Sequence, residues 1–191
     1  MGKFWKPALQ AQLEGDMMKS VLLLRHAKSD WSHFGLADFD RPLAKRGLKD
    51  APRIGRTLAD FSAVPDVILA SPAHRAKQTA KIVAETCGYT RSISWRDSFY
   101  GGDSDELIGA LQQLPDSVER AMLVGHNPTM EDTVSALLLG HESDWGQRFQ
   151  MKFPTAGLVC LDVLIEDWAD LEPGDAVLRW FIIPRLIKAI T

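Results

Sequence analysis

The chain of 191 residues has little cysteine and no long hydrophobic run. Its two cysteines, Cys87 and Cys160, lie in apolar segments without a Cys or His neighbour at metal-ligand spacing, so we expect buried free thiols in a reducing compartment. No apolar run approaches the roughly 20 residues of a membrane span. Residues 1–16 lack the continuous hydrophobic segment and the cleavage site of a signal peptide. These absences predict a cytoplasmic protein that does not insert into a membrane.

The chain also lacks an excess of positive charge. Its 22 Lys and Arg residues are outnumbered by 25 Asp and Glu residues, and a net charge of −3 gives no general attraction to nucleic acid or to anionic membranes. Any anion site must therefore be a local cluster of cationic side chains. The composition, 46% apolar and 25% charged, is that of an ordinary globular protein, and the length fits one domain. We expect this domain to span 17–191, with 1–16 as a tail or an accessory helix.

Short apolar runs alternate along the chain with longer amphipathic ones. This alternation is typical of an α/β protein with a largely parallel sheet. The expected strands are Val21–Leu24, Asp66–Ala70, Ile93–Trp95, Arg120–Val124, Leu158–Val163 and Ala176–Phe181.

Apolar residues at helical spacing predict four helices between these strands. They are expected at Leu43–Phe61, from Ser71–Pro72, at 103–114 and from Asn127–Pro128. The second and the fourth begin where a polar cap residue precedes a proline at the first helical position. Pro52 lies inside the first helix, which is therefore kinked there or starts later, and Asp103 or Ser104 caps the third. Residues 140–157 have no clean periodicity and are expected to form a loop with short helical turns.

Cationic and titratable side chains follow three of the expected strands. Arg25 and His26 follow the first, Arg75 lies in the first turn after the second, and His126 follows the fourth. Each has an ordinary structural explanation when taken alone. Because parallel strands end at one edge of the sheet, where helix N-termini also gather, the four together predict an anion pocket. Phosphate is the expected ligand, since Arg binds it bidentately in a way that Lys cannot.

The same residues suit phosphoryl transfer. A neutral imidazole is a competent nucleophile near pH 7, because its unperturbed pKa is about 6.5. We expect one ring nitrogen of His26 to attack phosphorus while the other donates to a backbone carbonyl or a carboxylate. His126, protonated by the charge of the phosphate, would stabilise the equatorial oxygens. Two arginines and an imidazolium supply the charge that Mg²⁺ would otherwise bring, so neither a metal nor a cofactor is expected.

Four ordered motifs resemble those of a known family. They are "LLLRHAKSDW", "DRPLAKRG", "SPAHRAKQTA" and "VGHNPTM". They are similar to the Arg-His-Gly, Asp-x-Pro-Leu with a following Gly, Ser-Pro-x-x-Arg-x-x-Gln-Thr-Ala and Gly-His motifs of the histidine phosphatase superfamily, which has the phosphoglycerate mutase-like fold. The resemblance covers most of the chain from about residue 19 on and looks closest to the SixA-like branch, associated with phosphohistidine phosphatase activity. It implies a three-layer α/β/α sandwich in which His26 is the nucleophile, Arg25 and Arg75 clamp the phosphate, and His126 completes the pocket.

The chain departs from the family pattern in three places. Ala27 replaces the usual Gly, Ser32 stands where many mutases carry an Asn near the phosphate, and no Glu clearly occupies the place of the general acid of larger relatives. Ser32, Arg41 and Asn127 are assigned to binding of the phosphate or the substrate. The candidates for the general acid are Asp97, which lies nearest to that place, and Asp38, Asp40 and Asp103.

The missing Glu favours a substrate with a P–N bond. An alkoxide leaving group gains from a positioned acid, whereas the imidazole of a phosphohistidine leaves already protonated near neutral pH. The chain has no room for long insertions between its motifs, so we expect a site mouth open enough for a protein surface. We predict a metal-independent phosphatase that dephosphorylates phosphohistidine in a protein partner, with phosphate or vanadate as site ligands. The alternatives are a small-molecule phosphomonoesterase or phosphoglycerate mutase-like enzyme, and a weakly catalytic phosphate-binding module.

Overall fold

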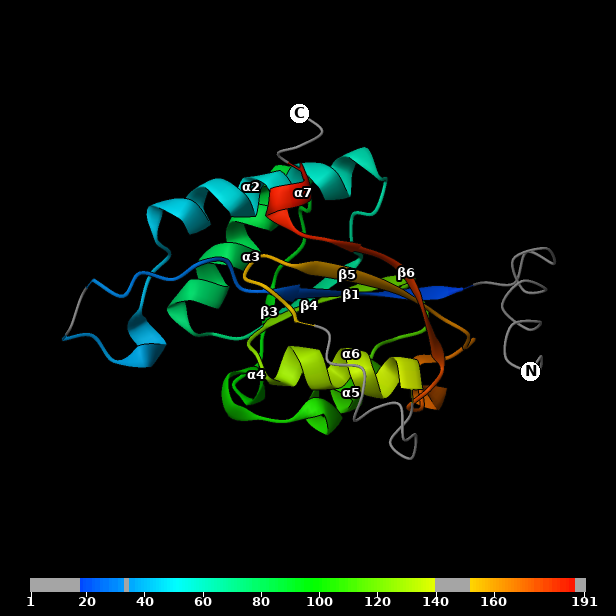
Figure 1. Cartoon of the computed structure of the whole chain (residues 1–191). Helices are drawn as coiled ribbons and strands as arrows, with labels where there is room; N and C mark the ends of the chain where they lie inside the picture. The colour runs from blue at the N-terminus through cyan, green and yellow to red at the C-terminus, as the bar shows by residue number, and fades with distance from the viewer. Residues whose placement is uncertain (1–17, 33–34, 140–151, 188–191) are drawn as a thin grey trace.

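In the computed structural model, which describes residues 18–32, 35–139 and 152–187, six strands form one sheet (Figure 1). They are β1 (Lys19–Arg25), β2 (Val67–Ala70), β3 (Ser94–Trp95), β4 (Arg120–Gly125), β5 (Leu158–Val163) and β6 (Ala176–Ile182). Their order is β3-β2-β4-β1-β5-β6. The first four strands are parallel, and β5 runs antiparallel to both of its neighbours. The six predicted strands and the mostly parallel sheet are confirmed.

Helices cover both faces of the sheet, which confirms the three-layer arrangement (Figure 1). On one face lie α2 (Lys45–Asp60), α3 (His74–Cys87) and α7 (Pro184–Ile187), and on the other α4 (Ser98–Gly101), α5 (Ser104–Gln112) and α6 (Thr129–Leu139). The short 3-10 helices are η1 (Asp38–Asp40) and η2 (Trp168–Asp170).

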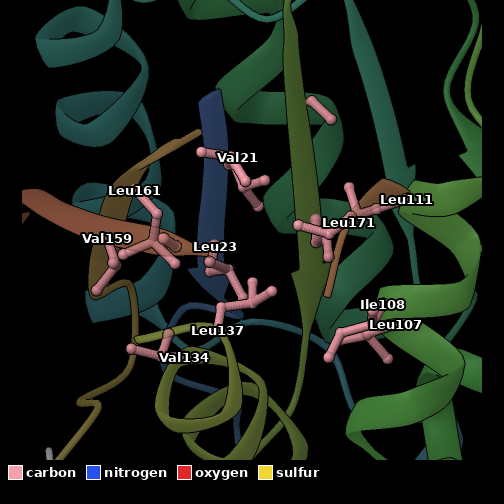
Figure 2. Close-up of a cluster of buried hydrophobic side chains, with 14 of the residues drawn as sticks. Val21, Leu23, Leu107, Ile108, Leu111, Val134, Leu137, Val159, Leu161 and Leu171 are labelled. Carbon is pink, nitrogen blue, oxygen red and sulfur yellow. The ribbon is translucent and has the colours of Figure 1, made fainter. Parts of the chain in front are cut away.

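The central strand β1 is buried on both faces, which explains its unbroken apolar run. Leu22 and Leu24 pack toward α2 and α3, whereas Val21 and Leu23 pack toward the other layer. Figure 2 shows this second core, where Leu23 lies with the side chains of α5 and α6. Each buried aliphatic side chain stabilises the fold by about 1.5–3 kcal/mol. The strand is thereby held firmly between the layers, and its carboxyl end is a fixed platform for the residues that follow.

The two helices predicted to start with a cap residue and a proline start later. The α3 helix begins at His74, and Ala73 at its N-cap position offers no side-chain hydrogen bond. The α6 helix begins at Thr129, and the Oδ1 atom of Asn127 has no hydrogen-bond partner among the described residues, so this side chain does not cap it and the predicted cap is wrong. Ser71 lies before the start of α3, and its Oγ accepts from the backbone N–H of Ala73 while it also bonds to His126.

The other predicted helices agree with the structure. The α2 helix begins at Lys45, after the Leu43 start suggested by the apolar pattern, and it continues through Pro52. Asp103 caps α5 in a capping box with Glu106, as expected from the sequence. Within the predicted loop 140–157, residues 152–157 form neither helix nor strand, and 140–151 lie outside the described residues, as does the predicted tail 1–16.

Close packing holds the loop after β1 against α2. A Cβ atom at Gly47 would overlap the carbonyl oxygen of Lys28, so the helix approaches the loop more closely than another residue allows. The same carbonyl accepts a hydrogen bond from the backbone N–H of Ala44 at 2.9 Å. Cys87 and Cys160 are buried free thiols, as predicted. None of the helices in the described parts of the chain is long and apolar enough to span a membrane.

Candidate active site

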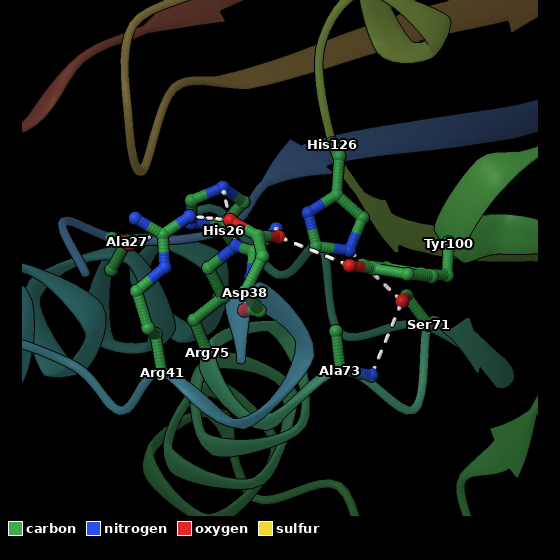
Figure 3. A network of polar contacts seen from close by, with 9 residues as sticks. All are labelled: His26, Ala27, Asp38, Arg41, Ser71, Ala73, Arg75, Tyr100 and His126. Carbon is green, nitrogen blue, oxygen red and sulfur yellow. Dashed lines mark hydrogen bonds and ion pairs between the residues drawn. The ribbon is translucent and has the colours of Figure 1, made fainter. Parts of the chain in front are cut away.

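His26, Arg75 and His126, which were predicted to follow three strands, meet at one edge of the sheet (Figure 3). His26 follows β1 and His126 follows its parallel neighbour β4, with their ring centroids 4.9 Å apart. Arg75, near the start of α3, donates from Nε to Nε2 of His26 at 3.3 Å. Arg25 is close enough to lower the pKa of both imidazoles. The structure thus brings the four residues together around one point.

A backbone hydrogen bond sets the tautomer of His26. Its Nδ1 lies 2.8 Å from the carbonyl oxygen of Ala27, and because a carbonyl only accepts, Nδ1 carries the proton. Nε2 then holds the lone pair and faces Arg75. Burial, and after it the neighbouring His126 and arginines, lower the pKa of His26 from 6.5 to about 3. The ring is therefore neutral at pH 7, as a nucleophile must be.

His126 is held from its other side by Ser71. Its Nε2 lies 2.9 Å from Oγ of Ser71, which accepts a hydrogen bond from the backbone N–H of Ala73 at 3.3 Å. We assign the hydroxyl proton of Ser71 to the bond with Nε2, which places the ring proton of His126 on Nδ1. This Nδ1 is buried and has no hydrogen-bond partner among the described residues, and it lies on the side of the ring that faces His26 (Figure 3). Burial, then Arg75 and Arg25, lower the pKa of His126 to about 3, so the imidazolium expected from the sequence needs the charge of a bound phosphate.

The segment before β5 fixes Arg25 and Asn127. The carbonyl oxygen of Phe153 accepts from Nη1 of Arg25 at 2.6 Å and from Nδ2 of Asn127 at 3.0 Å. Glu131 in turn accepts from the backbone N–H of Phe153 at 2.8 Å. Within the described residues, Nε of Arg25 is buried and has no hydrogen-bond partner, like Nδ1 of His126. A buried donor left unpaired costs about 1–3 kcal/mol.

Asp38 is the candidate acid that contacts the site. Nη1 of Arg75 donates to its carbonyl oxygen at 2.6 Å, and Nη2 donates to its Oδ2 at 2.8 Å. The carboxylate also pairs with Arg41 and accepts a hydrogen bond from the hydroxyl of Tyr100 at 3.1 Å. Asp38 therefore holds the outer nitrogens of Arg75, while Nε of the same guanidinium points at His26.

The other three aspartates have different surroundings. Asp40 is exposed, and its carbonyl oxygen bonds to Nδ1 of His74 at 3.2 Å. Asp97 is exposed at the N-terminus of α4, where its side chain makes no capping bond. The carboxylate of Asp103 is engaged by the backbone of α5. Of the four candidates, Asp38 is the one that the structure ties to the imidazole pair.

Of the other predicted binding residues, Arg41 is buried and Ser32 lies at the surface. The guanidinium carbon of Arg41 stacks 3.5 Å from the ring centroid of Trp31, whose side chain is 64% exposed. Ser32 is exposed, and its hydroxyl donates to Asp30 at 2.7 Å.

Sequence reasoning assigned no role at the site to Ser71 or Tyr100. Ser71 directly follows β2, as His26 follows β1, so its place after a strand was an available signal. Tyr100 lies in the short α4 helix, which the sequence did not predict, and its ring packs edge-on to His126 with centroids 5.6 Å apart. No group of three His, Cys, Asp or Glu side chains that could hold a metal ion occurs among the described residues.

Comparisons with known proteins agree with this geometry. The family model of the histidine phosphatase superfamily (branch 1) matches residues 21–101. An uncharacterized protein of Mycobacterium tuberculosis is 37% identical over 164 residues, which are 85% of this chain and 100% of the relative.

Two solved structures cover nearly the whole described fold. A SixA protein from Agrobacterium tumefaciens, assigned as a phosphohistidine phosphatase, is 34% identical with a TM-score of 0.72, over 87% of this chain and 98% of that chain. A SixA protein from Nakamurella multipartitia, assigned likewise, is 27% identical with a TM-score of 0.75, over 87% and 96%. The chain therefore belongs to the histidine phosphatase superfamily, and within it to the SixA-like branch. This membership supports a phosphatase activity.

Proposed function

We propose that this chain hydrolyses the P–N bond of phosphohistidine in a protein partner, with His26 as the nucleophile. The observation that carries the proposal is the hydrogen bond from Nδ1 of His26 to the carbonyl oxygen of Ala27, at 2.8 Å. It places the lone pair on Nε2, beside a guanidinium and a second imidazole. Because the pKa of His26 is lowered to about 3, this lone pair is free of a proton throughout the neutral range.

The phosphoryl group is held by donors that lack a partner within the described part of the protein. Nε of Arg25 and Nδ1 of His126 are both buried and unpaired, and a phosphoryl oxygen would satisfy each of them. Nε of Arg75 now donates to the lone pair of His26, and an incoming phosphoryl oxygen takes over this bond. The lone pair is thereby released when phosphorus arrives in front of it.

The first chemical step moves the phosphoryl group to His26. Its Nε2 forms a bond to phosphorus while the bond from phosphorus to the substrate imidazole breaks, and the imidazole leaves with the proton that it carries near neutral pH. Arg25, Arg75 and His126 stabilise the charge on the equatorial oxygens. In the second step water attacks phosphorus, its proton passes to solvent, and inorganic phosphate leaves with the electron pair returned to Nε2.

The surroundings of Asp38 agree with a nitrogen leaving group. Its carboxylate forms ion pairs with Arg41 and Arg75, and an ion-paired carboxylate has no proton to donate. A phosphomonoester would need such a proton on its alkoxide, whereas a phosphohistidine does not. The SixA structure from Agrobacterium tumefaciens, assigned as a phosphohistidine phosphatase, supports the same choice of substrate.

Trapping of the phosphoenzyme tests the nucleophile. The enzyme is mixed with a ³²P-labelled phosphohistidine peptide, quenched in alkali, and analysed for acid-labile phosphate on residue 26. We expect label on the wild type and on the His74→Ala control, which removes an exposed histidine of α3, and none on His26→Ala. A pure phosphate-binding module would never be labelled. Turnover of the peptide, an aryl phosphate and a phosphoglycerate then ranks the substrates, and a clear preference for phosphoglycerate would refute the proposal.

A further inference from the structure

A hollow of about 370 Å³ lies beside the candidate active site, between η1 and the first two turns of α3. Its lining residues are Phe39, Asp40, Pro72, His74, Lys77, Gln78 and Lys81. The four from α3 are spaced three, four and seven residues apart and so lie on one face of the helix. None of the seven is used by the chemistry described above.

The hollow is cationic. Lys77 and Lys81 have no ion pair with any of the described residues, although both line the same hollow. The ammonium of Lys77 instead lies 5.3 Å from the ring centroid of Trp95. Nδ1 of His74 bonds to the backbone carbonyl of Asp40, whose carboxylate is the acidic group of the lining. Two lysines against one carboxylate leave an excess of positive charge.

The hollow is connected with the pocket by aromatic contacts. The ring of Phe39, on its wall, packs edge-on to Tyr100 with centroids 5.0 Å apart, and Tyr100 packs against His126 at 5.6 Å. His74 of the lining directly precedes Arg75 of the pocket. A polypeptide whose phosphohistidine occupies the pocket would therefore carry its neighbouring residues across Phe39 into the hollow.

We propose that this hollow docks an acidic segment of the phosphoprotein substrate, one with Asp or Glu side chains close in sequence to the phosphohistidine. The choice of partner rests on the proposed function. The argument is charge complementarity: carboxylates of the segment pair with the ammonium groups of Lys77 and Lys81, and the side chains between them pack on Phe39 and Pro72. Pairs of this exposed kind are individually weak, so the two lysines are expected to contribute about threefold each and about tenfold together.

A binding experiment that needs no catalysis tests the docking. An unphosphorylated peptide with a Glu-rich flank is titrated into the protein, and the indole N–H signal of Trp95 is followed by NMR, with Trp95→Phe to assign it. We expect the signal to shift with the Glu peptide, to stay in place with its Gln counterpart, and to lose its response in Lys77→Gln/Lys81→Gln. An equal response to both peptides, or none to either, overturns the proposal.

A kinetic experiment separates the docking from the reaction. For phosphohistidine peptides at low salt, kcat/KM should be about tenfold higher with the Glu flank than with the Gln flank, and the double lysine variant should abolish this preference. Hydrolysis of a small phosphoramidate should be unchanged in that variant, and Lys49→Gln, an exposed lysine of α2, should behave as wild type. Equal rates on the two peptides refute the docking and leave the reaction standing. A Trp95 shift without turnover of either peptide refutes the reaction and leaves the docking standing.

Discussion

The two buried imidazoles should make the protein less stable in mild acid. The pKa values of His26 and His126 fall from 6.5 to about 3 in the folded chain, with burial as the largest cause. Because the folded-state pKa of each histidine lies below its unfolded-state pKa, the full contribution of the two imidazoles to stability is present above pH 6.5. It is lost progressively as the pH falls from about 6.5 toward 3, because the unfolded chain takes up protons that the folded chain does not.

The size of the effect follows from these values. At pH 5 an unfolded histidine with a pKa of about 6.5 is almost fully protonated, and its protonation lowers the free energy of the unfolded chain by about 2 kcal/mol. Because the folded-state pKa is about 3, the folded chain takes up almost no proton on His26 at pH 5, and its free energy is not lowered by a similar amount. Each of the two imidazoles is therefore expected to cost about 2 kcal/mol of unfolding free energy between pH 7.5 and pH 5. For a domain that is stable by about 5–15 kcal/mol, this loss is large.

Urea unfolding at pH 7.5 and pH 5 measures this loss, and a variant isolates one ring. His26→Asn keeps a polar side chain but cannot take up the proton, so it should lose about 2 kcal/mol less stability than the wild type over this interval. His74→Asn is the matched control, because it makes the same replacement at an exposed histidine. The carboxylates of the protein contribute alike to all three chains and cancel in the comparison.

If the wild type and His26→Asn lose the same unfolding free energy between pH 7.5 and pH 5, then His26 is not kept neutral by its surroundings. The account of the nucleophile would then fail with the account of stability, because both depend on the same buried lone pair. An NMR titration of the ring protons gives a direct check: the His26 signals should not titrate between pH 8 and pH 5.

Three further variants probe the surroundings of the imidazole pair. Ser71→Ala removes the partner of His126 and should lower kcat about two- to tenfold, the range expected for one net hydrogen bond, with folding unchanged by circular dichroism; an unaffected kcat would contradict the tautomer assigned to His126. Asp38→Asn removes the carboxylate charge that pairs with Nη2 of Arg75, while the backbone carbonyl of residue 38 still accepts from Nη1, so the inhibition constant of vanadate should fall about two- to fivefold; a rise would show that the carboxylate promotes vanadate binding instead of competing with it. Gly47→Ala should destabilise the fold by about 1–3 kcal/mol, measured by urea unfolding, because the added methyl group overlaps the backbone of Lys28. An unchanged unfolding free energy would show that the loop after β1 moves to accommodate the methyl group.

Most of the fold could be predicted from the sequence because its signals are local. The run Val21–Leu24 is apolar without a break because β1 is buried on both faces. This signal lies within the run itself, so it can be read without knowing which strands lie beside β1. The helix starts were less accurate. Ser71 and Asn127 have the side chains of cap residues, but Ser71 bonds to His126 and Asn127 bonds to Phe153, and neither partner is visible in a short window of sequence.

By itself, the sequence determined the alternation of strands and helices and the identity of the arginines and histidines that lie at or after the ends of β1, β2 and β4. The tertiary structure alone decided which carboxylate meets Arg75, which nitrogen of His26 keeps its lone pair, and how far burial lowers its pKa. The contacts responsible join Arg75 to His26 and to Asp38, residues that are 49 and 37 positions apart. Protonation and ion pairing depend on distance and burial, which chain folding sets, whereas strand and helix patterns depend on neighbours in the chain.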